Sequence, residues 1–571
     1  MAAVSYRPMA NPNESPRRLR FGVMCNGRRF PAWQAEAIRR LLDVPDIEVG
    51  LLIVRDAPLG AAGKLSRLRD WRHILWTMLN KGFIERRSRA SRSVDLSERL
   101  EGVPEIVCHT EPVGEFGEKF SDADIATIRE HALDFILRFS FGIIKGEILD
   151  VPRYGVWSFH HGDEREYRGR PPGFWELVDD KPTVGAILQR LTERLDGGVV
   201  LHRGSFRATP HSYRRTRDDA FLGSAVWPSI AARMIQNGDT SLAEAEPSTT
   251  DAPVKRDPAN ATMAAFLVQQ AARFAVNQVR GIARTAVWSV GVADVPIESF
   301  LDGEPAIFAW MAEQGRGRYL ADPFGYEHDG ELVLLVEDYR YDIHRGVISA
   351  IDVNGRSAKA RTVLDPGVHA SYPYLFEHDG NVYCVPETYQ ANEVRLYRAD
   401  PFPERWELVT TLVSGLAALD PTVLQHDGRW WLFCTDHADG PNTKLHVWHA
   451  DELEGPWQPH ALNPVKTDVR SARPAGTPFT HDAGLYRPAQ DGSSSYGGGV
   501  AINRIDELTP TTFRETVVAT VRPPATGRYR DGIHTLSAVG DRTVADGRRD
   551  TFVLAAFRRE LGSRIRKLGR G

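Results

Sequence analysis

The sequence predicts a multidomain protein with an α/β doubly wound N-terminal domain and an all-β C-terminal domain folded as a five-bladed propeller. Three observations support this. Candidate strands alternate with candidate helices as far as residue 237, the pattern of a mostly parallel sheet. A polar segment, rich in Ser, Thr and Pro, follows at 238–260. Beyond residue 288, strand-like runs are joined by turn signals that recur about every 50 residues.

With 571 residues, the chain is too long for a single hydrophobic core. We expect a disordered tail at 1–17, the α/β domain at 18–237, a linker at 238–260, a connecting helix at 261–287, the propeller at 288–560 and a basic tail at 561–571.

Composition narrows the classes of function. The formal net charge is −4, which argues against bulk binding of nucleic acid. The four cysteines form no CxxC pair, so neither a metal site nor a disulfide framework is indicated. No signal peptide and no apolar run of membrane-spanning length is visible. We therefore expect a cytoplasmic protein without an integral membrane segment, and the oligomeric state stays open.

The N-terminal elements follow from local patterns. Apolar runs predict strands, a capping pattern opens one helix, and the expected elements are strands at 20–24, 48–54, 105–109 and 134–139 and helices from 33 to 42 and after Ser121. In a doubly wound sheet, functional loops follow the carboxyl ends of the strands.

One histidine stands where such a loop begins. His160 ends the extended run Ser158-Phe159-His160, and Asp196 follows 36 residues later (196 − 160). That interval allows a strand, helix and strand to return the carboxylate beside the imidazole. A base oriented by a carboxylate is what general acid–base catalysis requires.

The segment around His160 resembles the folate-dependent formyltransferases, which act on methionyl-tRNA, glycinamide ribonucleotide and amino sugars. The residues that carry the resemblance are His160, the Tyr167-Arg168-Gly169 turn and the Asp196-Gly197-Gly198 turn, in that order. The resemblance implies attack of an amine on the formyl carbon of N10-formyltetrahydrofolate. It implies that His160 takes the amine proton or stabilises the oxyanion as imidazolium, and that Asp196 fixes its tautomer and raises its basicity.

The same resemblance assigns binding roles. The loop after the strand at 134–139 is similar to the loop that seats the pterin in that family, and the residues implied are Phe139, Phe141, Gly142, Ile143 and Ile144. Tyr167, Arg168 and Gly169 are implied to contact the substrate.

One family residue is replaced. The family has an asparagine that donates to the formyl oxygen, and this chain has Ser158 in its place. Losing one such donor costs about 10²–10³ in rate. Three outcomes are open: Ser158 or a neighbour such as His161 substitutes, the site is slow, or it is inactive.

The C-terminal half contains a repeat. Similar segments begin at Ala321, Ser371 and Leu419, and each reads as strand, His-Asp-Gly turn and strand. Two degenerate copies follow, near Ala475 and Asp531. Five antiparallel units predict a five-bladed propeller.

This half resembles the propeller region of the plant glucosamine inositolphosphorylceramide transferases, and the five-bladed propellers of furanosidase-type glycoside hydrolases. Arg473-Pro474-Ala475-Gly476, Arg487–Asp491 and Gly532–Leu536 carry the first resemblance. The residues expected to face a central funnel are Asp322, Glu337, Glu387, Asp420, Arg473 and His534, with Trp430, Trp431 and Tyr389 as further lining. The second repeat has Tyr372 where an aspartate would be expected.

Together these features favour a sugar-amine N-formyltransferase joined to a carbohydrate-binding propeller. The expected acceptor is an amino-sugar nucleotide or a glycolipid precursor of a cell-surface glycan, and N10-formyltetrahydrofolate is the expected co-substrate. Two alternatives stay open. The propeller could carry glycosidase or glycosyl-transfer chemistry beside an inactive N-terminal domain, or the protein could bind glycans without catalysis.

Overall fold

The computed structural model describes residues 17–56, 71–114, 117–194, 197–303, 307–315, 317–353, 359–552 and Gly562. The chain divides into two compact units, 1–273 and 274–571. The tails predicted at 1–17 and 561–571 lie outside the described residues, apart from Arg17 and Gly562.

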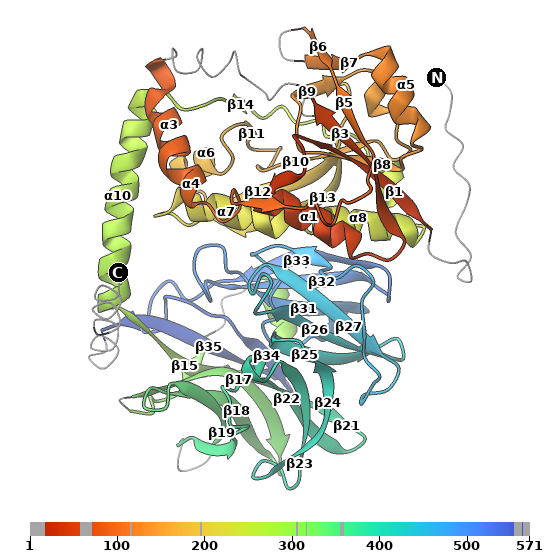
Figure 1. The fold of residues 1–571 in the computed structure, drawn as a ribbon. Coiled ribbons are helices and arrows are strands. Elements are labelled where there is room, and N and C mark those ends of the chain that lie inside the picture. Colours follow the sequence, from red (N-terminus) through yellow and green to blue (C-terminus); the bar gives the residue numbers. More distant parts are fainter. Residues whose placement is uncertain are drawn as a thin grey trace. The chain divides into compact units, whose positions relative to one another are not determined.

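The N-terminal unit is built on a seven-stranded sheet (Figure 1). Five neighbouring strands of this sheet are parallel, the next strand runs antiparallel to them, and the edge strand pairs antiparallel with that one. Across the sheet the order is β13 (Val199–Arg207), β12 (Thr183–Arg190), β10 (Val156–His160), β8 (Phe135–Arg138), β1 (Leu19–Cys25), β3 (Ile47–Arg55) and β5 (Glu105–Cys108).

Helices cover this sheet. Ile125 and Ile128 of α5 pack with Met24 and Ile53 of the sheet. Helix α1 contacts α7 and α8. The helices are α1 (Ala32–Leu42), α3 (Ile74–Leu79), α4 (Glu85–Arg87), α5 (Asp122–Glu130), α6 (Phe174–Val178), α7 (Tyr213–Ser224), α8 (Trp227–Gln236) and α9 (Ser241–Glu244). The α/β class predicted for this half is confirmed.

Three small sheets complete the unit. They consist of β2 (Arg29–Pro31) with β4 (Ser93–Asp95), of β6 (Thr110–Val113), β7 (Gly117–Phe120) and β9 (Ile143–Lys145), and of β11 (Arg168–Gly169) with β14 (Val254–Lys255).

The segment 238–260 is not a bare linker, which corrects the sequence prediction. It contains α9, and β14 pairs with β11 of the N-terminal unit. Composition predicted a linker because the segment is polar, yet its backbone groups find partners in the N-terminal unit. The connecting helix, α10, spans Asn260–Ala283, and the division between the units falls within it.

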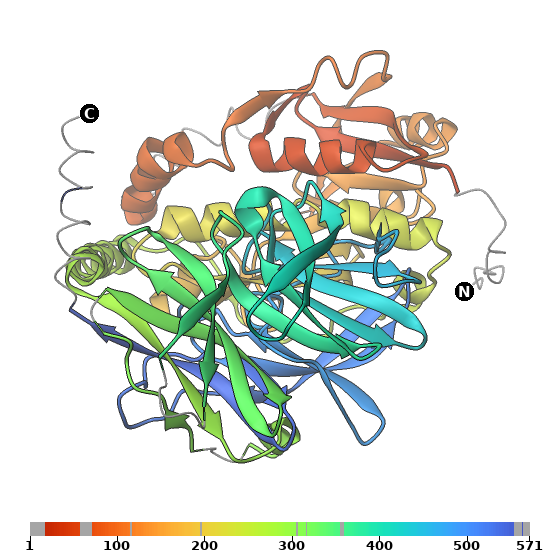
Figure 2. The same cartoon turned by 90° about the horizontal axis from the view of Figure 1, so that it is seen from below.

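The C-terminal unit is all β. Its described residues form five antiparallel sheets, seen green to blue in Figures 1 and 2. Four of them are β17 (Arg318–His328) to β20 (Arg361–Leu364), β21 (Ser371–His378) to β24 (Trp406–Ser414), β25 (Ala418–His426) to β29 (Lys466–Thr467), and β30 (Phe479–His481) to β33 (Phe513–Val521).

The other strands of these four sheets have the following bounds. They are β18 (Glu331–Arg340), β19 (Arg345–Asp352), β22 (Asn381–Glu387), β23 (Glu393–Ala399), β26 (Arg429–Asp436), β27 (Lys444–Ala450), β28 (Gln458–Pro459), β31 (Gly484–Gln490) and β32 (Val500–Leu508).

The remaining sheet joins the two ends of the unit. It contains β15 (Thr285–Ala293) and β16 (Ala309–Trp310) from the start, and β34 (Leu536–Val539) and β35 (Arg542–Thr551) from the end. Strand β15 pairs with β35 over nine residues, which ties the first strand of the unit to its last.

The repeated turns have the backbone geometry that their sequence predicts. Asp329-Gly330, Asp379-Gly380 and Asp427-Gly428 all have positive φ at both residues. Aspartate and glycine tolerate this conformation, and it matches the twist of the two strands that such a turn connects. The all-β class is confirmed, while the closed propeller arrangement stays a prediction.

Candidate functional site

His160 lies at the carboxyl end of β10, where the sequence placed it. Its Nε2 is 3.1 Å from the carbonyl oxygen of Tyr167. A carbonyl only accepts, so Nε2 carries the proton and donates it, and the lone pair of the neutral ring lies on Nδ1. Gly162 lies against this contact, because a Cβ there would be 3.0 Å from His160 Nε2 and 2.9 Å from Tyr167 O.

Ser158 is buried and lies two residues before His160 on the same strand, so both side chains lie on one face of the sheet. Its direct neighbour on the parallel strand β8 is Arg138. Arg138 donates to Ser158 Oγ from Nε at 3.2 Å and from Nη2 at 2.9 Å. The position of the family asparagine therefore holds a serine in contact with a guanidinium group.

Sequence reasoning missed Arg138. Its Nη1 donates to the carbonyl oxygens of Phe141, at 3.3 Å, and Gly142. Burial lowers its pKa to about 10, against the opposing effect of Glu118. The sequence does contain one indication of it: Arg138 is the single charged residue at the end of the apolar strand 135–138, which lies next to the strand of His160.

Asp196 lies outside the described residues, so its pairing with His160 stays a prediction. Thr192 Oγ1 donates to the carbonyl oxygen of Gly197 at 2.9 Å.

His161 is not placed to replace the missing asparagine, so within the first of the three open outcomes Ser158 remains as the substitute. It has the opposite side-chain direction to His160, is buried, and stacks on Phe221 with ring centroids 3.7 Å apart. Its Nε2 is 3.1 Å from Ser224 Oγ. Burial, with the nearby His160 and Arg217, holds its pKa well below the usual value, so the ring is neutral.

The loop predicted to seat a pterin is only partly available. Phe141 and Ile144 are buried in the core beside Phe120, and their predicted contact with a pterin stays a prediction. Gly142 donates its amide to Glu118 at 3.1 Å. Ile143 begins strand β9. Phe139 is half-buried and packs edge-on against Trp33.

The Tyr167-Arg168-Gly169 turn is held by the chain itself. Tyr167 donates its hydroxyl to Asp179 at 2.9 Å, and Arg168 donates to the carbonyl oxygen of Ala252 at 3.2 Å. Gly169 has φ of 88°, and a Cβ there would lie 2.1 Å from the carbonyl oxygen of Lys255. These contacts give the turn a structural role in docking β14.

In the C-terminal unit, one residue in the first half of each of the strands β17, β21 and β25 has an unusual backbone. Asp322, Tyr372 and Asp420 have φ of 49°, 45° and 50°, each within an interruption of strand register. Positive φ in non-glycine residues is strained and turns these side chains out of the normal alternation. Tyr372 is buried, and its hydroxyl lies 2.9 Å from Thr422 Oγ1 and accepts from the amide of Gly476.

Asp420, Glu387 and Arg473 come together in one buried network. Arg473 donates to both oxygens of Asp420, from Nη2 to Oδ1 at 3.1 Å, and its Nη2 lies 3.5 Å from Glu387 Oε2. The amide of Asp420 donates to Glu387 at 3.0 Å, and Gln490 donates to Asp420 at 2.7 Å. Burial and Asp420 raise the pKa of Glu387 well above its usual value, against the lowering effect of Arg473.

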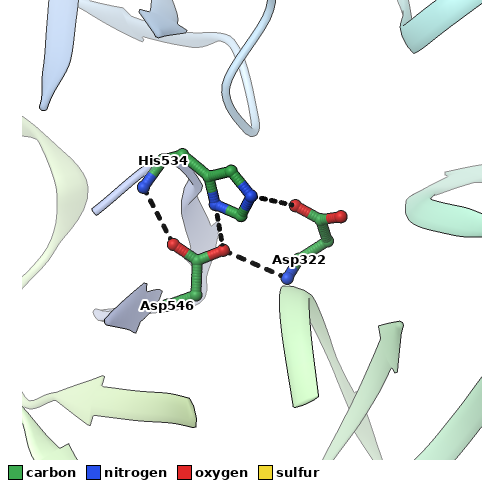
Figure 3. A group of neighbouring side chains, drawn as sticks. All are labelled: Asp322, His534 and Asp546. Atoms are coloured by element: carbon green, nitrogen blue, oxygen red, sulfur yellow. Dashed lines mark hydrogen bonds and ion pairs between the residues drawn. The ribbon is translucent and has the colours of Figure 1, made fainter. Parts of the chain in front are cut away.

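His534 lies between Asp322 and Asp546 (Figure 3). Its Nδ1 contacts Asp546 directly, and its Nε2 is 3.7 Å from Asp322 Oδ1. Burial opposes protonation of His534, but the two carboxylates outweigh it and raise its pKa. Burial raises the pKa of Asp322 to about 6, against the opposing effect of His534.

These three residues are spaced as metal ligands could be, since their ligand atoms lie within 4.8 Å of one another. Their oxygens are already engaged, however. Asp546 accepts the amides of Asp322, His534 and Thr535, and Asp322 accepts the Thr535 hydroxyl at 2.7 Å and the Tyr372 amide at 3.3 Å. The arrangement is an ion-paired and hydrogen-bonded network.

Of the other predicted lining residues, Trp430 and Trp431 are buried within their sheet and pack against aromatic neighbours, and their place in a funnel stays a prediction. Tyr389 is half-buried and stacks on His437. Glu337 is buried, and burial together with Asp322 and Glu387 raises its pKa well above the usual value.

Comparison with known proteins supports two resemblances. A family model described as "Glucosamine inositolphosphorylceramide transferase 1, N-terminal" matches residues 306–532. The rice (Oryza sativa subsp. japonica) protein of that name is 34% identical over 208 residues, which are 35% of this chain and 28% of the relative. The methionyl-tRNA formyltransferase of Acidobacterium capsulatum is 30% identical over 149 residues, which are 26% of this chain and 45% of the relative.

Two solved structures are similar to parts of the chain. An exo-β-1,3-galactanase from Clostridium thermocellum has 14% identity and a TM-score of 0.29, covering 37% of this chain and 54% of that one. A phosphoribosylglycinamide formyltransferase from Anaplasma phagocytophilum has 16% identity and a TM-score of 0.27, covering 39% and 89%. The composite predicted from the sequence is confirmed as a resemblance: one part is similar to formyltransferases, the other to the inositolphosphorylceramide transferase family.

Proposed function

We propose that the N-terminal unit transfers a formyl group from N10-formyltetrahydrofolate to the amine of an amino sugar. The observation that carries the proposal is His160, whose Nε2–H donates to Tyr167 O and leaves Nδ1 basic, beside the buried Ser158 on the same face. A base and a hydroxyl donor at one strand end are the groups that acyl transfer to an amine requires.

The residues fit the formyl end of the donor better than its pterin end. Phe141 and Ile144 are buried, so a pterin would have to be held by backbone and by Phe139. In the reaction, Nδ1 of His160 takes a proton from the attacking amine as the new C–N bond forms. Ser158 faces the oxygen that becomes negative. His160 then returns the proton to the departing folate nitrogen as the old C–N bond breaks.

For the C-terminal unit we infer a five-bladed propeller that binds carbohydrate. The support is five antiparallel sheets in the described residues and the pairing of β15 with β35, which joins the ends of the unit. The matching family is named for a glucosamine transferase acting on inositolphosphorylceramide. This favours a sugar acceptor, carried by a nucleotide or a lipid, over tRNA or another nucleic acid.

The proposal places the protein in the cytoplasm, in keeping with four buried cysteines that form no disulfide. No described helix is long and apolar enough to cross a membrane.

A second candidate is glycosidic-bond chemistry in the C-terminal unit. The raised pKa of Asp322, about 6, favours it, because an acid and a base of separated pKa are what such enzymes use. Against it, both oxygens of Asp322 and both of Asp420 are already bound by the chain. We therefore assign these residues to structure.

The deciding experiment measures formyl transfer to a panel of amino-sugar nucleotides, with binding of 5-formyltetrahydrofolate by calorimetry. We expect His160→Ala to lower kcat by about 10³ and to leave folate binding within a few-fold. His109→Ala, at an exposed histidine of the same unit, is the control. Transfer that survives His160→Ala would refute the proposal. Glycosidase activity lost in Asp322→Asn with Asp420→Asn would support the second candidate.

A further inference from the structure

Arg138 is a cation whose hydrogen bonds go to neutral oxygens. Its acceptors are Ser158 Oγ and the carbonyl oxygens of Phe141 and Gly142. Among the described residues, no carboxylate lies within ion-pair distance of it. The acid that acts on it from further away, Glu118, is paired with Arg55 at 2.9 Å. A partly buried guanidinium without a direct counter-ion favours negative charge nearby.

The same contacts set the direction of the Ser158 hydroxyl. A hydroxyl has two acceptor lone pairs and one proton. Two N–H groups of Arg138, on Nε and Nη2, occupy the lone pairs. What remains is the proton. Among the described residues its acceptor is the carbonyl oxygen of Phe159, 3.5 Å away, at the limit of a hydrogen bond. Ser158 is thus left as a donor, on the face that holds His160.

We propose that Arg138 and Ser158 act as one unit that stabilises the oxyanion formed at the formyl carbon. Ser158 donates its proton to that oxygen, and Arg138 orients the hydroxyl and supplies the compensating positive charge. The inference rests on the formyl transfer proposed above. It explains how a serine serves at a position where the related family has asparagine.

Protons and electron pairs balance over the reaction. When the amine attacks, the carbonyl π pair moves onto the formyl oxygen, which becomes negative, while His160 holds the amine proton. The negative oxygen accepts from Ser158 and lies in the field of Arg138. When the carbonyl re-forms, the electron pair returns and the folate nitrogen leaves with the proton from His160. Arg138 exchanges no proton and is a positioning residue.

Four variants test whether Arg138 and Ser158 act together. Arg138→Met removes the charge but keeps much of the volume, and Ser158→Ala removes the hydroxyl. Each should lower kcat by about 10² while KM for the formyl-folate changes less than about three-fold. Because the two residues act together, Arg138→Met with Ser158→Ala should lose little more than either single variant.

The fourth variant restores a donor by other means. In Arg138→Met with Ser158→Asn, the asparagine amide can donate without help from a guanidinium. We expect kcat about ten-fold above that of Arg138→Met alone. A purely structural role for Arg138 predicts no such recovery, and thermal unfolding of all four variants identifies any that misfold.

A spectroscopic readout needs no turnover. With a formyl-folate labelled with ¹³C at the carbonyl and no amine present, the infrared carbonyl stretch reports the hydrogen bond to the oxygen. The stretch should lie lower in the wild type than in Ser158→Ala or Arg138→Met. This inference alone is overturned if the wild type transfers the formyl group while Arg138→Met keeps kcat within three-fold of the wild-type value and leaves the carbonyl stretch unshifted. A wild type that neither binds nor uses formyl-folate would overturn the proposed function, and this inference with it.

Discussion

Each unit of the protein contains buried charged groups, but the two clusters differ in whether the cationic group has a carboxylate beside it. In the C-terminal unit, Arg473 meets Asp420 and Glu387, and His534 meets Asp322 and Asp546. In the N-terminal unit, Arg138 meets a serine and two carbonyl oxygens.

The difference separates structure from chemistry. A buried network in which each group has its partner rigidifies the fold, and it loses stability when one member is removed. A cation left without a direct counter-ion is held by the surrounding fold and is available to a charge that appears during a reaction. By this criterion the C-terminal acidic residues hold the fold, and Arg138 marks the candidate active site.

The largest effect is expected from Asp420→Ala. Arg473 would lose both of its contacts to Asp420 and stay buried with Glu387 as the remaining carboxylate beside it. Breaking one side of a buried ion pair costs about 3–5 kcal/mol. We expect the free energy of unfolding of the C-terminal unit to fall by that amount in urea titration, with formyl transfer per folded molecule unchanged.

Asp451→Ala is the matched control, because Asp451 pairs with Arg429 on the surface at 3.0 Å. Its effect should stay below about 1 kcal/mol. If Asp420→Ala is as mild as Asp451→Ala, the network is not what holds the unit together, and the comparison between the two clusters fails.

The second prediction concerns pH. The folded pKa of Asp322, about 6, is above the usual 3.8. Its contribution to stability is therefore fully present below pH 3.8 and is lost as pH rises through about 6. The pKa of His534 is also raised, so its contribution is lost at still higher pH. Asp322 is also surrounded by Asp546, which accepts its amide, by Tyr372 and Thr535, which donate to it, and by Asp420, which raises its pKa further.

We expect the C-terminal unit to unfold more easily at pH 8 than at pH 5, by an amount of order 1–3 kcal/mol. Asp322→Asn should reduce that slope, since it removes one titrating group. Chemical denaturation at a series of pH values measures how the free energy of unfolding changes with pH. A stability that rises between pH 5 and 8 would contradict the assignment.

Much of the fold could be predicted from the sequence, because periodicity and turn chemistry are local. The three Asp-Gly turns are an example, since both residues suit positive φ. The site was predicted less completely. Side-chain alternation alone would have excluded His161, which points away from the face of His160. Arg138 could not be found this way, because its role depends on strand β8 lying beside β10, and that pairing is not encoded locally.

The third prediction tests the segment whose order the sequence did not reveal. Gly169→Ala would place a Cβ 2.1 Å from the carbonyl oxygen of Lys255, at φ of 88°. We expect β14 to detach, with about 2 kcal/mol lost locally. Faster hydrogen exchange at the Arg170 amide, which donates to Lys255 at 3.1 Å, would report it. Gly102→Ala is the control: its φ is 74° with nothing within 4 Å, so equal effects would rule out the docking role.

The smallest effect is expected next to the candidate base. Gly162→Ala would bring a methyl group to 3.0 Å from His160 Nε2 and 2.9 Å from Tyr167 O, so the pair must separate by a few tenths of an ångström. Since misplacement of a catalytic group by about 1 Å can cost 10², this smaller shift should lower kcat about ten-fold, with KM and thermal stability little changed. Gly82→Ala, with open space around it, should leave kcat unchanged. If the two variants behave alike, the contact between His160 and Tyr167 does not position the base. Arg138 would then lie beside a histidine that the fold does not hold in place for catalysis.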